Sequence, residues 1–295
     1  MSAAASTPAD EGLLVLRAAR RHVWLLEEEG PRRHRVRGGE RLVPGDRVIP
    51  AADGAIDGPA ERRNALERRT VKGDRLLAAN LDGLLILLAH GTRDGGEGFI
   101  ARCVAAAAAE GIEPLLVFNK ADLDTEGDLG ARMALHERLG FRVLRVSAQS
   151  GEGLEALEAL LAGKVTALVG FSGVGKSTLI NALDLEAEIP EGDVDEKGRG
   201  RHTTTLGQAY PWKGGALIDL PGIRSFGLLS EDGIDAAFPE LAGLAEGCRF
   251  ADCQHLTEPD CAVLEALEAG EVEEERLEVW RGIRESVESD GEGRW

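Results

Sequence analysis

The sequence predicts a multidomain protein in which a small antiparallel β-barrel is followed by a parallel α/β domain and then by a helical, metal-binding domain. Three observations predict this order. Short strand-like runs separated by turns fill residues 11–50, apolar runs alternate with helical stretches over residues 83–161, and three of the four cysteines fall within residues 248–261. Alternation of strands that are apolar throughout with helices is typical of a parallel sheet covered on both faces.

Length and composition fit two or three domains with a substantial core. The chain has 295 residues, of which 43% are apolar. None of its apolar runs approaches the roughly 20 residues that span a bilayer, and residues 1–10 lack the basic and apolar regions of a signal peptide. We therefore expect a cytoplasmic protein without a membrane segment, whose first ten residues form a disordered tail. We also expect it to act as a monomer. Four cysteines fit that compartment.

The net charge of −18 argues against loose attraction to nucleic acid, but the charge is unevenly distributed. Residues 11–75 hold fifteen Arg and Lys against eleven Asp and Glu. If the chain contacts RNA, we expect the contact on this segment.

The N-terminal strands are predicted over residues 13–16, 22–26, 32–36 and 47–49, before an irregular linker over 51–74. About five short strands in some 55 residues suit an oligonucleotide-binding (OB) barrel. Six arginines could contact phosphates: Arg20, Arg21, Arg32, Arg33, Arg35 and Arg37. A merely solvated strand face explains them equally well, and few aromatic residues accompany them.

Residues 170–177 predict a phosphate-binding loop, because they follow an apolar run at 165–169 and open a helix-compatible segment. Glycines in such a loop let backbone N–H groups surround the phosphates. Lys176 would reach the β and γ phosphates, and the Ser177 hydroxyl would bind Mg²⁺. A chance glycine-rich turn is the alternative, but the strand-loop-helix context argues against it.

A guanine site is predicted upstream of that loop. Asn119-Lys120-Ala121-Asp122 follows an apolar strand, and an Asp carboxylate there accepts hydrogen bonds from the guanine N1–H and amino group, which adenine does not offer in that arrangement. Asn119 would brace the loop and Lys120 would pack along the base. Ser147-Ala148-Gln149 resembles the loop whose backbone contacts guanine O6, with Gln149 in place of the usual lysine.

Two switch elements are predicted downstream. A hydroxyl of the run Thr203-Thr204-Thr205, with Thr204 and Thr205 as the candidates, would complete the Mg²⁺ shell. Asp219 and Gly222 match the DxxG motif, in which the Asp holds Mg²⁺ through water and the Gly N–H senses the γ phosphate.

The order of these motifs predicts a circularly permuted P-loop GTPase domain, because the guanine motifs precede the phosphate loop instead of following the switches. A sheet assembled in space tolerates such a rearrangement when the chain is cut at an exposed loop. The residues expected to bind GTP are Asn119, Lys120, Ala121, Asp122, Ser147, Ala148, Gln149, Gly170, Phe171, Ser172, Gly173, Val174, Gly175, Lys176, Ser177, Thr178, Asp219 and Gly222.

Cys248, Cys253, His255 and Cys261 predict a structural zinc site. Three thiolates and one imidazole make a closed tetrahedral set for Zn²⁺. Free buried cysteines are the alternative. The acidic helical stretch at 262–287 carries an apolar stripe, which we expect to be core packing for a small helical domain.

With barrel, permuted GTPase and Cys/His cluster in this order, the chain resembles the ribosome small subunit-dependent GTPase A family (RsgA, also called YjeQ) over its length after the tail. The matching segments are 79–82, 200–205, 219–228, and the metal cluster with Glu258-Pro259. The resemblance implies a GTPase that serves late maturation of the small ribosomal subunit, hydrolyses GTP when bound to it, and clamps ribosomal RNA between barrel and zinc domain.

The expected domains are the tail over 1–10, the OB barrel over 11–65, the permuted GTPase domain over 75–228 and the zinc and helical domain over 229–295. Two other functions fit parts of the pattern. One is a GTP-regulated RNA-binding scaffold in which hydrolysis is incidental. The other is a DNA-reading factor, which the acidity around the metal ligands disfavours.

The catalytic group is the least determined part of the site. Ile223 follows the DxxG motif where many GTPases place a water-orienting Gln, so we expect slow intrinsic hydrolysis. His202, beside the Thr run, is our candidate for orienting the water. The alternatives are a histidine in a mobile loop that contacts RNA or nothing, and Arg201 acting on the γ phosphate or on an RNA phosphate.

Overall fold

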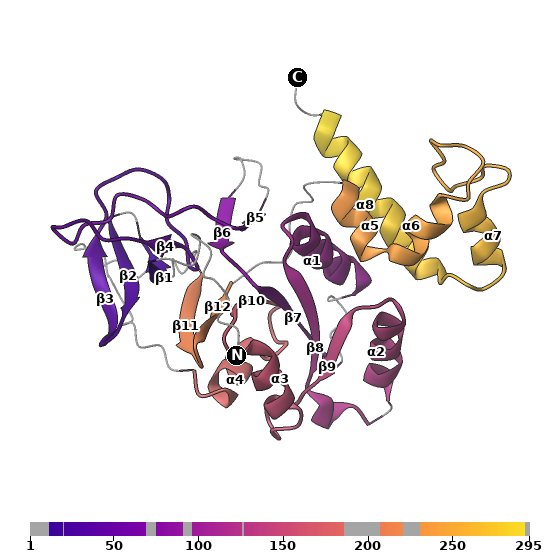
Figure 1. Ribbon diagram of the computed structural model, residues 1–295. Coiled ribbons are helices and arrows are strands. Elements are labelled where there is room, and N and C mark those ends of the chain that lie inside the picture. The colour runs from indigo at the N-terminus through magenta and orange to yellow at the C-terminus, as the bar shows by residue number, and fades with distance from the viewer. Residues whose placement is uncertain are drawn as a thin grey trace, which may run out of the picture.

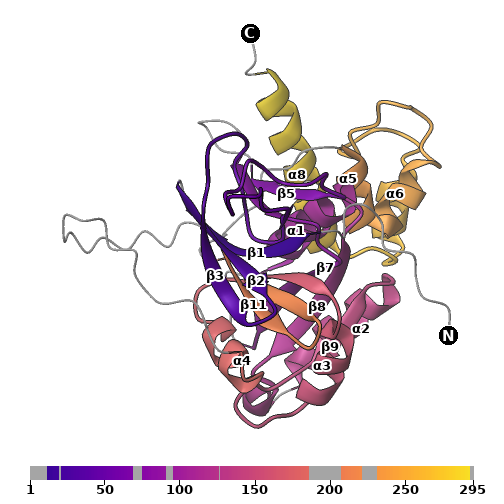
Figure 2. The same cartoon turned by 60° about the vertical axis from the view of Figure 1, so that its left-hand side comes forward.

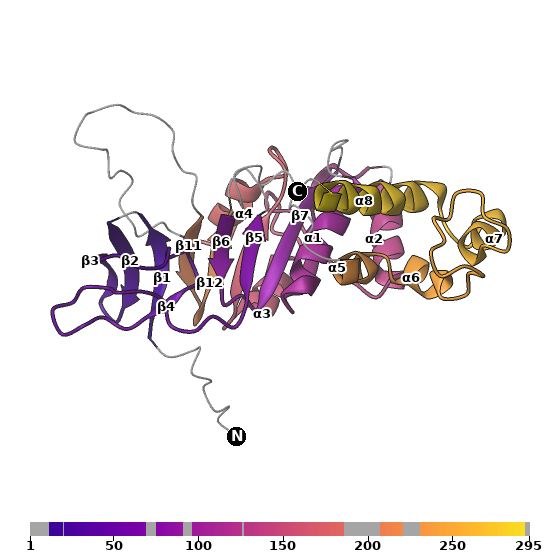
Figure 3. The same cartoon turned by 90° about the horizontal axis from the view of Figure 1, so that it is seen from above.

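The computed structural model describes residues 12–19, 21–68, 75–90, 96–125, 127–185, 207–220 and 231–292. The expectations for the N-terminal tail, for Arg20, for residues 201–205 and for residues 222–223 lie outside these ranges. Figure 3 shows three bodies in a row, with a small β-sheet domain at one end, the central sheet with its helices in the middle and a helical domain at the other end. The predicted multidomain architecture is confirmed.

The N-terminal domain is a four-stranded antiparallel sheet in the order β3-β2-β1-β4. Its strands are β1 Leu13–Ala18, β2 His22–Glu27, β3 Gly30–Arg35 and β4 Arg47–Val48. A parallel bridge between Val36 and Ile56 draws the following segment against the sheet, and both Ile56 and Val48 are buried in the core of this domain. This OB-like arrangement matches the predicted small β domain.

The predicted irregular linker over 51–74 is wrong for its last part. β5 (Ala65–Arg68) pairs antiparallel with β6 (Arg75–Ala79), and Leu66 and Ala78 of this hairpin are buried in the core of the central domain. The many charges around these two apolar residues leave no alternating pattern that would predict a strand. Contacts with residues farther along the chain also hold the hairpin in place. The Ala65 N–H, for example, donates to the Glu110 carboxylate.

The central domain is a six-stranded sheet in the order β11-β12-β10-β7-β8-β9. Its strands are β7 Gly83–Ala89, β8 Glu113–Asn119, β9 Arg142–Arg145, β10 Val165–Val169, β11 Gln208–Trp212 and β12 Gly215–Asp219. All neighbours are parallel except β11, which runs antiparallel to β12. Figure 2 shows β11 next to β1, so the N-terminal sheet lies along this edge.

Helices cover both faces of this sheet, as predicted (Figure 1). α1 (Glu97–Ala109) and α2 (Asp128–Arg138) pack against one face. α3 (Leu154–Leu161) and α4 (Lys176–Ala182) pack against the other. β7 and β10 are buried along their whole length, which explains why all their residues except Thr166 are apolar or glycine. Cys103 on α1 is fully buried, as expected for a structural thiol.

The C-terminal domain consists of α5 (Glu231–Ala237), α6 (Pro239–Ala245), α7 (Ala262–Glu268) and α8 (Glu274–Glu292). The continuous helical stretch expected over 262–287 is broken, because Gly270 takes a positive φ of 73° between α7 and α8. The apolar stripe is core packing as predicted, with Leu277, Trp280 and Ile283 buried. Among the described helices, none combines the length and the apolar character needed to cross a membrane.

Candidate nucleotide site and metal site

The predicted nucleotide-binding segments meet at one edge of the central sheet. They follow the carboxyl ends of four parallel strands, namely β8, β9, β10 and β12. In an open α/β sheet, ligands bind at this end, beyond the carboxyl ends of the parallel strands. β10 and β12, which come late in the chain, lie next to β7 and β8, which come early. The motifs therefore come together although their order in the chain is rearranged.

Residues 170–177 form the predicted loop between β10 and α4. Gly175 caps α4 with a positive φ of 96°, and a Cβ there would lie 2.5 Å from the Asn119 Nδ2 atom. Only glycine fits both conditions. The Lys176 ammonium donates to the carbonyls of Gly170 and Phe171 inside the loop, whereas Ser177 and Thr178 are exposed.

Asp219 ends β12 beside the loop. Its Oδ1 atom is buried and has no hydrogen-bond partner among the described residues. This fits a carboxylate whose partner is a bound ion or its water. Desolvation raises the pKa of Asp219 and lowers that of Lys176, and the attraction between the two charges opposes both shifts. A bound Mg²⁺ and phosphates would replace the missing solvation of this pair.

Asn119 connects the guanine loop with the phosphate loop, as expected of a bracing residue. Its side chain donates to the Val174 carbonyl at 2.9 Å and accepts from the Ala148 N–H at 3.0 Å. The side chain is buried, with 1% exposure. One amide therefore ties together three segments that are 29 and 55 residues apart.

Asp122 lies in the short 3-10 helix η2 (Ala121–Leu123) that follows Lys120. Asp122 is exposed, and its carboxylate accepts a hydrogen bond from the Ser147 hydroxyl. Lys120 takes a left-handed conformation with φ 62°, which turns the chain from β8 into η2. Gln149 is exposed in the turn after Ser147. The carboxylate that would read guanine is thus oriented by the second predicted guanine loop.

Sequence analysis missed Arg145, the last residue of β9. Its guanidinium donates to groups in both guanine loops, the Ala121 carbonyl and the Glu152 carboxylate. An arginine two positions before the Ser147 loop is the one signal that could have indicated it.

The other predicted residues at this site lie outside the described part of the chain. They are Gly222, the run Thr203 to Thr205, and His202 with its neighbours Arg201 and Ile223. Their roles stay predictions.

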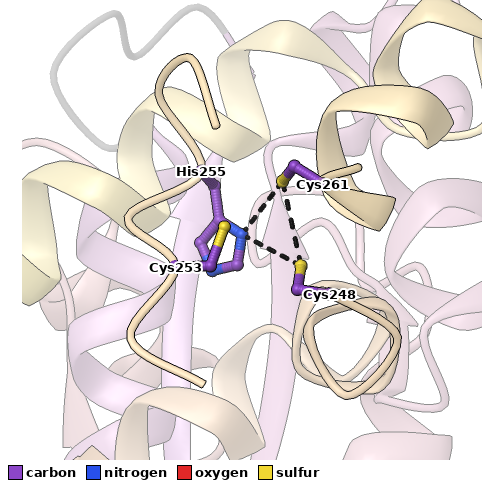
Figure 4. Close-up of side chains that lie close together, drawn as sticks. All are labelled: Cys248, Cys253, His255 and Cys261. Atoms are coloured by element: carbon purple, nitrogen blue, oxygen red, sulfur yellow. Dashed lines mark hydrogen bonds between the residues drawn. The ribbon is translucent and has the colours of Figure 1, made fainter. Parts of the chain in front are cut away.

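The three cysteines and the histidine of the predicted metal site come together between α6 and α7, with all four donor atoms within 4.8 Å of one another. Figure 4 shows the side chains converging. The Cys248 Sγ lies 3.8 Å from the Cys261 Sγ, and the His255 Nδ1 lies 3.5 and 3.4 Å from these two sulfurs. Zn–S bonds of about 2.3 Å and Zn–N bonds of about 2.0 Å give tetrahedron edges of about 3.8 and 3.5 Å. The donor set therefore fits Zn²⁺.

Neighbouring groups hold the metal loop in place. The His255 ring lies 4.9 Å from the buried Trp280 ring, and Arg281 donates to the His255 carbonyl. The Glu258 carboxylate accepts from three backbone N–H groups of the loop, those of Gln254, Leu256 and Thr257. These bonds lower the pKa of Glu258 to about 2. The loop thus has the supporting contacts of a structural site.

The N-terminal arginines differ in what they contact. Arg33 and Arg35 are exposed on β3. Arg32 forms ion pairs with Glu27 and Glu29 on the same hairpin. Arg37 is bonded to Asp53 and Asp57, so it holds the loop that follows.

Comparison with known proteins gives consistent results. A family model described as RsgA GTPase matches residues 59–229. The chain is 42% identical over 258 residues to the small ribosomal subunit biogenesis GTPase RsgA of Pseudomonas fluorescens, covering 83% of this chain and 75% of the relative. It is 40% identical over 267 residues to a Vibrio vulnificus protein named small ribosomal subunit biogenesis GTPase RsgA 1, covering 85% and 76%.

Solved structures show the same architecture. The crystal structure of YjeQ from Thermotoga maritima matches with a TM-score of 0.69 and 28% identity, over 93% of this chain and 98% of that one. YloQ, described as a circularly permuted GTPase, matches in fold with a TM-score of 0.67 at 23% identity, over 97% and 99%. The permuted order of motifs predicted from the sequence therefore has a structural counterpart. On the family model and the identity to curated relatives, this chain belongs to the RsgA GTPase family.

Proposed function

We propose that this protein is a GTPase that binds the small ribosomal subunit, assists its late maturation, and hydrolyses GTP on contact with the subunit so that it is released. The observation that carries the proposal is the meeting of the guanine loops, the phosphate loop and Asp219 at one sheet edge, in the permuted order of a GTPase family whose curated members are named for small-subunit biogenesis.

Binding roles follow from the chemistry of each group. Asp122 accepts hydrogen bonds from the guanine N1–H and amino group. Asn119 holds the two guanine loops and the phosphate loop together through its side-chain hydrogen bonds. Lys176 moves from the Gly170 and Phe171 carbonyls to the β and γ phosphates when nucleotide enters. Ser177, one of Thr204 and Thr205, and Asp219 through water would hold Mg²⁺, which would supply positive charge against the charge that develops on the phosphates.

We assign the zinc domain and the barrel to partner binding. Zn²⁺ at the Cys₃His set would be structural, since a closed set of four protein ligands leaves no open coordination position for chemistry. We place the barrel at 11–65, the GTPase domain at 75–228 and the zinc and helical domain at 229–295, in a cytoplasmic monomer.

Phosphate release measured over many turnovers, with and without purified small subunits, tests the proposal. We expect slow release from GTP alone and strong stimulation by the subunits. Tight GTP binding without stimulation would favour the alternative, a GTP-regulated RNA-binding scaffold. Equal uptake of ATP and GTP, or of neither, would remove the basis of the proposal.

We further propose that His202 orients the attacking water, because Ile223 has an apolar side chain and lacks the hydrogen-bonding groups for this task. His202→Ala should then lower subunit-stimulated turnover by about 10²-fold or more and leave GTP binding intact. Arg201→Ala is the parallel variant. Stimulated turnover near that of the unsubstituted protein would exclude His202 as the catalytic group.

A further inference from the structure

We infer that Arg145 is a positioning residue for guanine recognition, fastening the two guanine loops to each other and thereby setting how strongly the site prefers guanine. This inference rests on the proposed function, because it concerns the same nucleotide site. Arg145 is the last residue of β9, and the residue Val146 that follows leads directly into the Ser147 loop.

Three nitrogen atoms of this guanidinium are used. Nη1 donates to the Asp124 carboxylate at 2.8 Å, Nη2 to the Ala121 carbonyl at 3.0 Å, and Nε to the Glu152 carboxylate at 3.0 Å. The planar guanidinium of arginine holds its N–H donors in fixed, different directions and can therefore bond three separate acceptors at once. The ammonium group of a lysine is less suited to this geometry. Two of the three bonds join charged partners and are therefore of the stronger kind.

The positions of these acceptors bracket the guanine-reading residue. Ala121 precedes Asp122 directly and Asp124 follows it by two positions, so both flanks of Asp122 are bonded to one side chain. Asp124 is also anchored on its other side, where its carboxylate accepts from the Leu129 N–H at the start of α2 and lies 3.7 Å from the His90 Nδ1 atom.

The same guanidinium reaches the second guanine loop. Glu152 closes that loop, since its carbonyl accepts from the Ser147 N–H at 2.9 Å. Ser147 in turn donates its hydroxyl to Asp122. Arg145 therefore fixes the backbone of η2, the end of the Ser147 loop and, through both, the direction in which the Asp122 carboxylate points.

The exposure of the two side chains shows why Asp124 depends on Arg145. The Asp124 side chain is 2% exposed, whereas that of Arg145 is 34% exposed. A buried carboxylate that loses its cationic partner is strongly destabilised and moves toward water. Without Arg145, Asp124 should leave its position and carry η2 with it, so that Asp122 no longer meets both guanine donors at once.

The test compares guanosine diphosphate with inosine diphosphate, whose base keeps N1–H but lacks the amino group. Both nucleotides compete against a fluorescent GDP analogue on the full-length protein. For Arg145→Met we expect the Kd for guanosine diphosphate to rise about tenfold, the equivalent of about 1.4 kcal/mol. The Kd for inosine diphosphate should rise less than about threefold, because its base offers the Asp122 carboxylate one donor instead of two and so loses less when the carboxylate is displaced.

Two further variants make the outcome decisive. Arg142→Met is the matched control, because Arg142 opens the same strand and forms its exposed ion pair with Glu113 away from the guanine loops. It should change neither Kd. Asp124→Asn keeps the shape of the acceptor and removes its charge, and should narrow the guanosine preference in the same direction as Arg145→Met, which covers the case that Arg145→Met folds poorly.

The ratio of the two dissociation constants separates positioning from general stability, since misfolded protein lowers the number of sites and leaves this ratio unchanged. An unchanged ratio in the folded fraction of Arg145→Met and in Asp124→Asn would overturn the inference. If the unsubstituted protein shows no preference for guanosine over inosine diphosphate, the assignment of Asp122 is wrong, and the proposed function falls with it.

Discussion

At the scale of single residues, the site depends on side chains that each serve more than one segment. Asn119 is the clearest case, because its buried amide satisfies the Val174 carbonyl of the phosphate loop and the Ala148 N–H of the guanine loop. Arg145 does the same for η2 and the Ser147 loop. A motif residue is therefore both a possible ligand contact and a structural tie between loops.

Asn119→Ala tests this double role. Removing the amide takes away the partner of the buried Val174 carbonyl and of the partly buried Ala148 N–H, and an unpaired buried polar group costs about 1–3 kcal/mol. We expect the free energy of unfolding to fall by about 2 kcal/mol and the Kd for GDP to rise at least about tenfold. Equilibrium denaturation and nucleotide titration measure the two effects. Asn181→Ala, at an exposed position of α4, is the control and should change neither.

At the scale of the elements, the central and C-terminal domains meet along α1. α5 begins at Glu231, only a few residues after the segment that holds Gly222, and packs closely on α1. At Gly233 a Cβ would lie 2.6 Å from the Ala105 carbonyl oxygen, so the two helices approach each other closely there. The chain thus runs from the DxxG segment directly into the interface between these domains.

A buried ionic group strengthens that interface. Arg276 of α8 is 3% exposed and donates to Glu240 of α6 and to Glu97 of α1, and the His136 ring of α2 lies 3.1 Å from the same Glu97 carboxylate. Desolvation would raise the pKa of Glu97, but His136 and Arg276 outweigh it and hold this pKa below its usual value.

The sign of the resulting pH dependence follows from linkage. Because the folded pKa of Glu97 is the lower one, its contribution to stability is present above the unfolded pKa of about 4.3 and is lost as pH falls through the folded value. Glu97→Gln should therefore lower the denaturation midpoint at pH 7, and its difference from the unsubstituted protein should shrink as pH falls below about 4. Glu278→Gln, at an exposed position of α8, should show no such trend. A difference that grew with acidity would contradict the assignment.

The metal loop gives a second prediction at this scale. Cys261→Ala should reduce bound zinc from about one per chain to none, because three ligands no longer close the site. The freed loop should become open to trypsin after the exposed Arg249, while GDP binding at the distant sheet edge persists. Metal analysis and limited proteolysis measure this. Cys103→Ala, in the buried middle of α1, should keep its zinc. Zinc retained in Cys261→Ala would show that the four residues are not one site.

At the scale of the whole molecule, the sequence predicts what depends on local order and misses what depends on distant contacts. The motifs could be placed because parallel strands bring their carboxyl ends to one edge, so Asn119, Ser147, Gly170 and Asp219 meet as expected. The pairing of β5 with β6 and the bonds of Arg145 depend on how separate segments pack together, and no local periodicity indicates them. The break at Gly270 is local, because the N–H groups of Gly270 and Glu271 return to carbonyls of α7, the helix ending that glycine favours.

The uneven charge of the molecule gives the last prediction. If the basic N-terminal sheet contacts RNA phosphates, binding to purified small subunits must weaken as salt rises, with each lost phosphate contact lowering the slope by about 0.7–0.9. Replacing the exposed Arg35 of β3 by Gln should then lower this slope by about 0.7–0.9. Arg37→Gln is the matched control, because Asp53 and Asp57 already neutralise Arg37. Equal slopes for Arg35→Gln and the unsubstituted protein would contradict an RNA phosphate contact at this position of β3.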